Sequence, residues 1–254
     1  MSASEPLTVL FWNIWIQNQL TAKRLDVLRR RLGRLIEQYQ PHAIGLNEVL
    51  AGVKNSHPPV LAFLEEQGYH THFEPFSPED SGQFIGSAVA TRDQPADISS
   101  HVLGPDTAAA RRGFAGHEVR LIKAQIEYAG RPVTIIVNHL AHLVPYNWKT
   151  HLTHLKSFKE IIADSARDNL IMGGDFNQFK FMPKLWGAHQ MYQRRTGNVL
   201  RPTWRLGGFT PIIQANYDHV FWPKASELQL HSFRVLPRSP SDHAPLLARF
   251  TWAP

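Results

Sequence analysis

Four short apolar runs in this sequence each end on a polar residue, and this arrangement limits the possible folds more than any other feature does. Their β-prone composition predicts buried strands. They are LTVLFWN ending at Asn13, HAIGLNE ending at Glu48, PVTIIVNH ending at His139 and NLIMGGD ending at Asp175. A single Asn or Asp in such a place is usually a cap or turn residue. Four polar strand ends together predict one shared site, because ligand-binding groups gather outside the carboxyl ends of buried strands.

Two amphipathic helices are predicted between these runs. The segment AKRLDVLRRRLGRLIEQYQ separates the first two runs and repeats apolar residues at helical spacing, namely Leu25, Leu28, Leu32, Leu35, Ile36 and Tyr39. The segment NWKTHLTHLKSFKEIIADSA separates the last two runs in the same way. Strand, helix and strand therefore follow one another twice, which favours an α/β fold.

The composition is that of one folded domain, which we expect to span residues 1–254, since 43% of the residues are hydrophobic. The chain has no cysteine, which excludes disulfides, thiolate zinc sites and cysteine nucleophiles. Its formal charge of +6 mildly favours polyanionic partners such as nucleic acid. The first residues, MSASEPLTVLFWNIWIQNQL, resemble neither a signal peptide nor a membrane span, so a cytoplasmic protein is expected. No obligate protein partner is evident.

Two later motifs add candidate catalytic groups. The segment QANYDHVFWP places Asp218 in a predicted strand, and SPSDHAPLLARF places Asp242 and His243 just before a closing strand. A carboxylate that orients a histidine, with a second carboxylate beside it, is the arrangement needed to activate water.

Taken in order, WNI, LNEV, NHL, GGDFNQ, YDHVF and SDHAPL resemble the motifs of the endonuclease/exonuclease/phosphatase superfamily, which includes deoxyribonuclease I. The resemblance covers nearly the whole chain. It implies a four-layer α/β/β/α sandwich of two packed mixed sheets, with a divalent cation at the strand ends. Two motifs depart from the usual pattern: Asn47 stands where Gln often precedes the glutamate, and Asn138 stands where Thr often precedes the histidine.

The resemblance also implies a metal site. Glu48 is the expected metal ligand, supported by Asn13, and Asp242 is expected on the metal side. Mg²⁺, with Mn²⁺ as the alternative, suits a pocket of carboxylate and carboxamide oxygens.

The reacting groups implied by the resemblance lie in the other motifs. Asp175 and Asn177 are expected to position the attacking water and a phosphate oxygen. Asp218 is expected to orient His243, which acts as a base or stabilises the transition state, and His139 is expected to bind or protonate the phosphate.

These observations favour a metal-dependent phosphodiesterase, most simply a nuclease that acts on DNA, with Arg111, Arg112 and His142 as further substrate-binding candidates. Arg194, Arg195, Arg201 and Arg205 are equally compatible with a surface role. One alternative is a phospholipid or small phosphoester hydrolase, for which FTPII and LVPYNW are short apolar stretches that could contact a membrane. The other is a binding protein that has lost the chemistry, which fits poorly because every expected polar group is present.

A histidine-rich zinc site is a weaker alternative. His139 and His142 are followed by His151 and His154, and residues three apart can share one face of a helix. We expect His151 and His154 to be solvated on their helix, since helical surface positions usually are.

Overall fold

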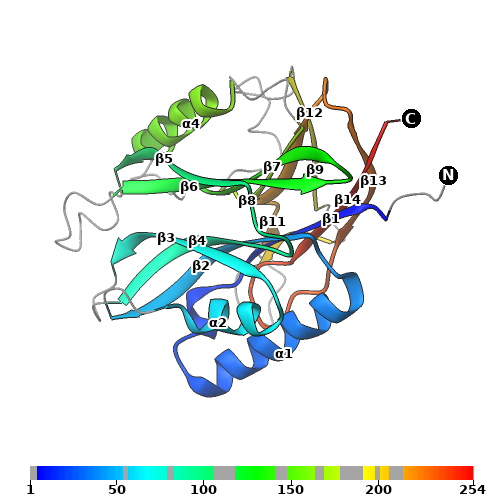
Figure 1. Ribbon diagram of the computed structural model, residues 1–254. Helices are drawn as coiled ribbons and strands as arrows, with labels where there is room; N and C mark the ends of the chain where they lie inside the picture. The colour runs from blue at the N-terminus through cyan, green and yellow to red at the C-terminus, as the bar shows by residue number, and fades with distance from the viewer. Residues whose placement is uncertain are drawn as a thin grey trace.

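Two six-stranded sheets lie face to face, with helices on the outer face of each, as the computed structural model shows (Figure 1). Helix α4 (Trp148–Ala163) covers one sheet, and helices α1 (Ala22–Tyr39) and α2 (Pro59–Glu66) cover the other. This is the four-layer α/β/β/α arrangement with two mixed sheets that the motifs implied, so that prediction is confirmed.

The structure describes residues 5–53, 57–78, 83–105, 118–140, 148–163, 169–177, 191–197, 201–205 and 214–253. The first sheet has the order β13-β14-β1-β2-β4-β3, with β1 (Leu7–Asn13), β2 (Ala43–Val53), β3 (His70–Pro78), β4 (Gln83–Thr91), β13 (Leu228–Val235) and β14 (Leu246–Trp252). The second has the order β5-β6-β7-β8-β12-β9, with β5 (Asp97–Pro105), β6 (Glu118–Tyr128), β7 (Arg131–His139), β8 (Leu170–Asp175), β9 (Tyr192–Thr196) and β12 (Asp218–Pro223). The short elements are η1 (Ile16–Asn18), β10 (Trp204–Arg205) and β11 (Gln214–Ala215).

Each sheet contains a central parallel pair joined by a helix. Strands β1 and β2 are parallel and are connected through α1, and strands β7 and β8 are parallel and are connected through α4. Parallel neighbours need such a crossover, so the predicted strand, helix and strand units are both confirmed. Each pair brings two carboxyl strand ends to the same edge of its sheet.

The residues of β1 alternate between two cores. Leu7, Val9 and Phe11 face the second sheet and pack in the core between the sheets. Leu10 and Trp12 face the opposite way and pack in the core that includes the apolar stripe of α1. Because both faces of this strand are buried, its sequence is a nearly continuous apolar run.

The ring of Phe11 sets how closely the sheets approach near the site. A Cβ atom on Gly173 of β8 would lie 2.4 Å from this ring, and one on Gly45 of β2 would lie 2.6 Å from it. Both positions therefore have to be glycine for the ring to fit between the two sheets. The close contact brings the end of β1 next to the end of β8.

The prediction that His151 and His154 are solvated was wrong. Both side chains are completely buried on α4, which packs against the second sheet through Phe158 and other apolar residues. His154 Nε2 lies 3.1 Å from the carbonyl oxygen of Pro105 on β5. These histidines share the inward face of the helix because they are three residues apart.

Among the described helices, none is long and apolar enough to cross a membrane.

Candidate active site

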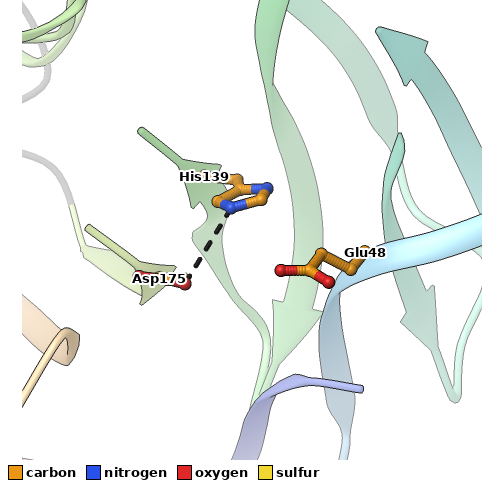
Figure 2. A group of neighbouring side chains, drawn as sticks. All are labelled: Glu48, His139 and Asp175. Carbon is orange, nitrogen blue, oxygen red and sulfur yellow. Dashed lines mark ion pairs between the residues drawn. The ribbon is translucent and has the colours of Figure 1, made fainter. Parts of the chain in front are cut away.

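The polar residues at the ends of the four predicted runs lie close together, where the two sheets come together. Asn13 and Glu48 belong to the first sheet, and His139 pairs in register with Asp175 in the second. Figure 2 shows Glu48, His139 and Asp175 pointing toward one another, and His139 Nε2 lies 3.9 Å from Asp175 Oδ2. The side chains that were expected to share one site are therefore neighbours in the folded chain, and their functional roles stay predictions.

Glu48 reaches the site from a bulge and not from a strand end. The predicted run ended at Glu48, whereas β2 continues to Val53, so that boundary was wrong. The pairing of β2 with β4 shifts register between Leu46 and Val49, and Glu48 adopts a φ of 56°. The Gln19 side chain holds this bulge, since its Nε2 donates to the Glu48 carbonyl oxygen at 2.7 Å. A bulge redirects a side chain while the strand goes on.

Asn13 connects the carboxylates of the two sheets. Its Nδ2 donates to Glu48 Oε1 at 2.8 Å and to Asp175 Oδ2 at 3.1 Å, while its Oδ1 accepts from the backbone nitrogen of Trp15 at 3.0 Å. Asn13 is completely buried. In this orientation it supports the two carboxylates with a donor, and a direct role as metal ligand stays a prediction.

The backbone of Asp175 is held by the side chain of Asn47. In the sequence, Asn47 was notable only as a departure from the family pattern. Asn47 Oδ1 accepts from the Asp175 backbone nitrogen at 2.9 Å, and Asn47 Nδ2 donates to Ser87 Oγ at 3.0 Å. The preceding Gly174 has a φ of 131°, and a Cβ there would lie 2.2 Å from the Asn138 carbonyl oxygen. The position of Asn47 before Glu48 was the only available signal for its role.

Asn177 closes the other side of the Asp175 carboxylate. Its backbone nitrogen donates to Asp175 Oδ1 at 2.8 Å, and its Nδ2 donates to the Leu140 carbonyl oxygen at 2.7 Å. Asn177 adopts a φ of 48° and is buried. Left-handed backbone at non-glycine residues is uncommon and gathers at functional sites. Asn177 and Glu48 both have it here.

His243 lies between two carboxylates. Its Nδ1 is 2.8 Å from Asp218 Oδ2, and its Nε2 is 3.7 Å from Asp175 Oδ2. Asp218 reaches this position because β12 runs antiparallel to β8 and pairs Asp218 with Asp175. Both members of the pair are buried, so the imidazole is fixed by Asp218 with its second nitrogen directed at the strand ends.

The electrostatic surroundings of this pair favour a charged imidazole. Burial acts to lower the pKa of His243, but the carboxylates of Asp218 and Asp175 outweigh it and raise that pKa to about 10. Burial is the largest influence on the Asp218 carboxyl and raises its pKa to about 6, although the facing His243 acts in the opposite direction. The two groups therefore favour an ion pair around neutral pH.

Asp242 lies on the Glu48 side of the site. Its Oδ2 accepts from Trp204 Nε1 at 3.0 Å. Burial raises the pKa of Asp242, His243 acts to lower it, and the negative charge of Glu48 raises it further. The electrostatic coupling between the two carboxylates agrees with the expected position of Asp242, whose role as a ligand remains a prediction.

Three substrate-binding candidates, Arg111, Arg112 and His142, lie outside the described residues. Arg194 and Arg195 belong to β9, which pairs with β12 at one edge of the second sheet. The guanidinium of Arg195 lies 6.0 Å from the centre of the Trp222 ring, and burial lowers the pKa of Arg194. Arg194 is half-buried and Arg195 is exposed, and a role of either arginine in phosphate binding stays a prediction.

Two groups of side chains among the described residues could hold a cation. One consists of Glu48, His139 and Asp175, and the other of Asp175, Asp218 and His243; the ligand atoms within each group lie within 4.8 Å of one another. The two carboxylates of the first group, Glu48 and Asp175, are ligands of the kind that a hard divalent cation prefers. In the second, His243 Nδ1 is already engaged by Asp218. The first group is therefore the better metal site.

A comparison with protein-family models identifies the family of the chain. The model of the Endonuclease/Exonuclease/phosphatase family matches residues 10–243. The chain belongs to this family. The members of the endonuclease/exonuclease/phosphatase family are metal-dependent phosphoric ester hydrolases, so the protein is an enzyme of this type and uses a divalent metal ion. The search of curated proteins found no match.

Solved structures share the fold of this endonuclease/exonuclease/phosphatase member at low sequence identity. A family protein from Leptotrichia buccalis aligns with a TM-score of 0.73 and 16% identity, covering 97% of this chain and 100% of that one. The human Nocturnin catalytic domain with bound sulfate aligns at 0.70 and 20%, covering 98% and 94%. D. rerio TDP2 complexed with a single-strand DNA product aligns at 0.71 and 15%, covering 97% and 99%.

Proposed function

We propose that this hydrolase is a Mg²⁺-dependent phosphodiesterase that cleaves DNA. The observation that carries the proposal is the position of Asp175, whose Oδ2 is shared by the candidate metal group and by the imidazole of the Asp218–His243 pair. A phosphodiester placed at this carboxylate would face a cation on one side and a proton-carrying histidine on the other. Phosphoryl transfer requires charge neutralisation and positioning of this kind.

The metal side of the site consists of Glu48 and Asp175, with Asn13 between them and Asp242 nearby. A bound Mg²⁺ would polarise a phosphoryl oxygen and neutralise charge there. Two hydrogen bonds position Glu48. Gln19 Nε2 donates to its carbonyl oxygen, and the backbone nitrogen of Ile16 donates to its Oε2 at 3.2 Å.

The opposite side of the site handles protons and orientation. Asp218 holds the Nδ1 of His243, which leaves Nε2 to give or take a proton near Asp175. His139, which also belongs to the candidate metal group, has about 9% of its surface exposed, and we assign it to contact with a phosphate oxygen as the resemblance implies. Asn177 fixes the Asp175 carboxylate through its backbone nitrogen, and we assign its side chain to substrate contact as the resemblance implies.

DNA is favoured as the substrate by the formal charge of +6 and by the single-strand DNA product in the TDP2 structure, a protein of the same fold. Phospholipid or small phosphoester hydrolysis remains the second candidate, since one fold hosts many substrates. A membrane role would depend on the FTPII and LVPYNW stretches. FTPII lies outside the described residues, and so does LVPYNW except for its last residue, Trp148. A cytoplasmic location also stays a prediction.

The test is a substrate panel. The purified protein is incubated with plasmid DNA, linear DNA, RNA, sphingomyelin and a generic phosphodiester, each with Mg²⁺ and with a chelator. Mg²⁺-dependent cleavage of DNA in preference to the other substrates supports the proposal. Faster turnover of sphingomyelin or of the generic diester, with DNA left intact, would assign the enzyme to the second candidate.

A further inference from the structure

A cavity lined by arginines lies beside the candidate active site. It has a volume of about 490 Å³, and its lining includes Arg201, Arg234 and Arg238. No carboxylate is present among the described residues that line it. Three guanidinium groups around one cavity favour the binding of an anion there.

One wall of this cavity is continuous with the catalytic groups. The lining residue Pro202 directly precedes Thr203, whose Oγ1 accepts from the Asp218 backbone nitrogen at 3.1 Å. The lining residue Ala244 directly follows His243, and its backbone nitrogen donates to the Thr203 carbonyl oxygen at 2.7 Å. Since adjacent Cα atoms are about 3.8 Å apart, the cavity begins one residue away from the Asp218–His243 pair.

The segment that carries two of the arginines also carries the catalytic histidine. Arg234 lies near the carboxyl end of β13, where it pairs with Leu247 of β14. Arg238 follows four residues later, and the chain then reaches His243. Ser241 anchors this segment, because its Oγ donates to the Asn13 carbonyl oxygen at 2.7 Å and accepts from the His243 backbone nitrogen at 3.0 Å. The backbone that leads from Arg238 to His243 is therefore tied to the end of β1.

Helix α1 adds to the positive charge around the cavity. Arg31 Nη2 donates to the carbonyl oxygen of Pro237, a lining residue, at 3.2 Å. Burial lowers the pKa of Arg31, and the positive charge of Arg34 lowers it further. Basic groups from the helix and from the 234–238 segment are thus gathered on one side of the site.

We propose that this cavity binds backbone phosphates of a nucleic acid strand whose scissile phosphate lies at Asp175, an inference that rests on the proposed function. Guanidinium groups bind phosphate oxygens through paired hydrogen bonds, so arginine suits this role better than lysine. The position of the cavity selects a ligand with several phosphates, because only an extended polyanion can occupy the cavity and the catalytic carboxylate together. An acidic peptide would match the charge but not the phosphoester chemistry next to it.

The test measures binding of a fluorescent single-stranded DNA oligonucleotide by anisotropy, in the presence of a chelator and between about 50 and 200 mM salt. The variant Arg234→Gln/Arg238→Gln is compared with Lys156→Gln/Lys159→Gln, which removes the same formal charge from the exposed face of α4. We expect the arginine variant to weaken binding about tenfold and to reduce the salt slope by about 1 to 2. The lysine control should match the parent, and Arg234→Lys/Arg238→Lys should retain most of the slope. Thermal melting verifies that each variant is folded.

The outcomes separate this inference from the proposed function. Equal affinity and equal salt slope in the two glutamine variants would overturn the inference, even if the parent cleaves DNA with Mg²⁺. Polyglutamate that binds as tightly as DNA, and whose binding is lost in the same arginine variant, would also overturn it by assigning the cavity to acidic peptides. Arginine-dependent DNA binding without any DNA cleavage by the parent would support the cavity and count against the proposed substrate.

Discussion

The side chain of Asn47 accepts a hydrogen bond from the backbone nitrogen of Asp175 at 2.9 Å and so joins the two sheets at the candidate active site. Asn47 is in β2 of the first sheet, and Asp175 ends β8 of the second. The same side chain donates to Ser87 on β4. One buried carboxamide therefore sets the position of the carboxylate that both halves of the site share.

We expect Asn47→Ala to reduce both stability and turnover. The substitution leaves the buried Asp175 backbone N–H without its acceptor, which costs about 1–3 kcal/mol, and it releases the Asp175 carboxylate from its position. Chemical denaturation measures the first effect and kcat the second. Ser87→Ala is the matched control, because it removes the other partner of Asn47 and leaves the contact with Asp175 in place. Equal turnover losses in the two variants would contradict a specific role for the Asp175 contact.

We expect Gly174→Ala to be far more harmful than Gly68→Ala, although both glycines have positive φ. Gly174 has a φ of 131°, and a Cβ added there would lie 2.2 Å from the carbonyl oxygen of Asn138. Gly68 has a φ of 85°, and a Cβ added there would have no atom within 4 Å. Backbone strain alone costs about 1–2 kcal/mol, and the added clash brings Gly174→Ala to about 2–5 kcal/mol. Thermal and urea unfolding of the two variants give the comparison. Similar losses of stability in the two variants would mean that the end of β8 can shift to make room for the added Cβ atom.

Glu48→Gln is expected to weaken metal binding while keeping the hydrogen bond that Asn13 donates. Losing the carboxylate should raise the Mg²⁺ concentration for half-maximal activity about tenfold or more, equivalent to about 1.4 kcal/mol. The increase in melting temperature that Mg²⁺ produces in the parent should shrink in parallel, because a ligand stabilises a protein according to its affinity. Glu160→Gln, an exposed position on α4, is the control. An unchanged Mg²⁺ requirement would remove Glu48 from the ligand set.

The pair Asp218 and His243 should behave as one unit. Asp218→Asn, His243→Ala and the double variant should each lower kcat by a similar factor of about 10³, since residues that act together are strongly non-additive. Steady-state kinetics on all three variants, with folding verified by thermal melting, provides the double-mutant cycle. Losses that multiply in the double variant would mean that the two residues act independently.

The ion pair also predicts a pH dependence of stability in the metal-free protein. The pKa of His243 is raised to about 10 in the folded state, above its ordinary value of about 6.5 in an unfolded chain. Its contribution is therefore fully present below about pH 6.5 and is lost as the pH rises toward 10, because there the folded state holds a proton that the unfolded state has released. Asp218→Asn should flatten this slope and lower the His243 pKa, as NMR titration of the imidazole would show. If the stability of the parent protein stayed constant between about pH 6.5 and pH 10, the Asp218–His243 ion pair would be contradicted.

Several strands and two of the helices could be predicted from local pattern. The run LTVLFWN forms β1 over the predicted residues, and the helical spacing in AKRLDVLRRRLGRLIEQYQ forms α1 almost completely. Both depend on interactions between near neighbours, which the sequence displays directly. The order of the polar motifs was also sufficient to indicate the family and its hydrolytic chemistry.

Relations between distant segments were decided only by the tertiary structure. The bulge that directs Glu48 depends on Gln19, the position of Asp175 depends on Asn47, and the burial of His154 depends on α4 packing over β5. The Phe11 ring between two glycines determines how near the sheets come, and the arginine cavity joins segments from three parts of the chain. Sequence alone determined where several of the strands and helices form and which chemical groups the chain carries, because these follow from short-range periodicity and residue type. The distances between those groups arise from close packing of side chains that are far apart in the sequence, so only the folded structure could decide them.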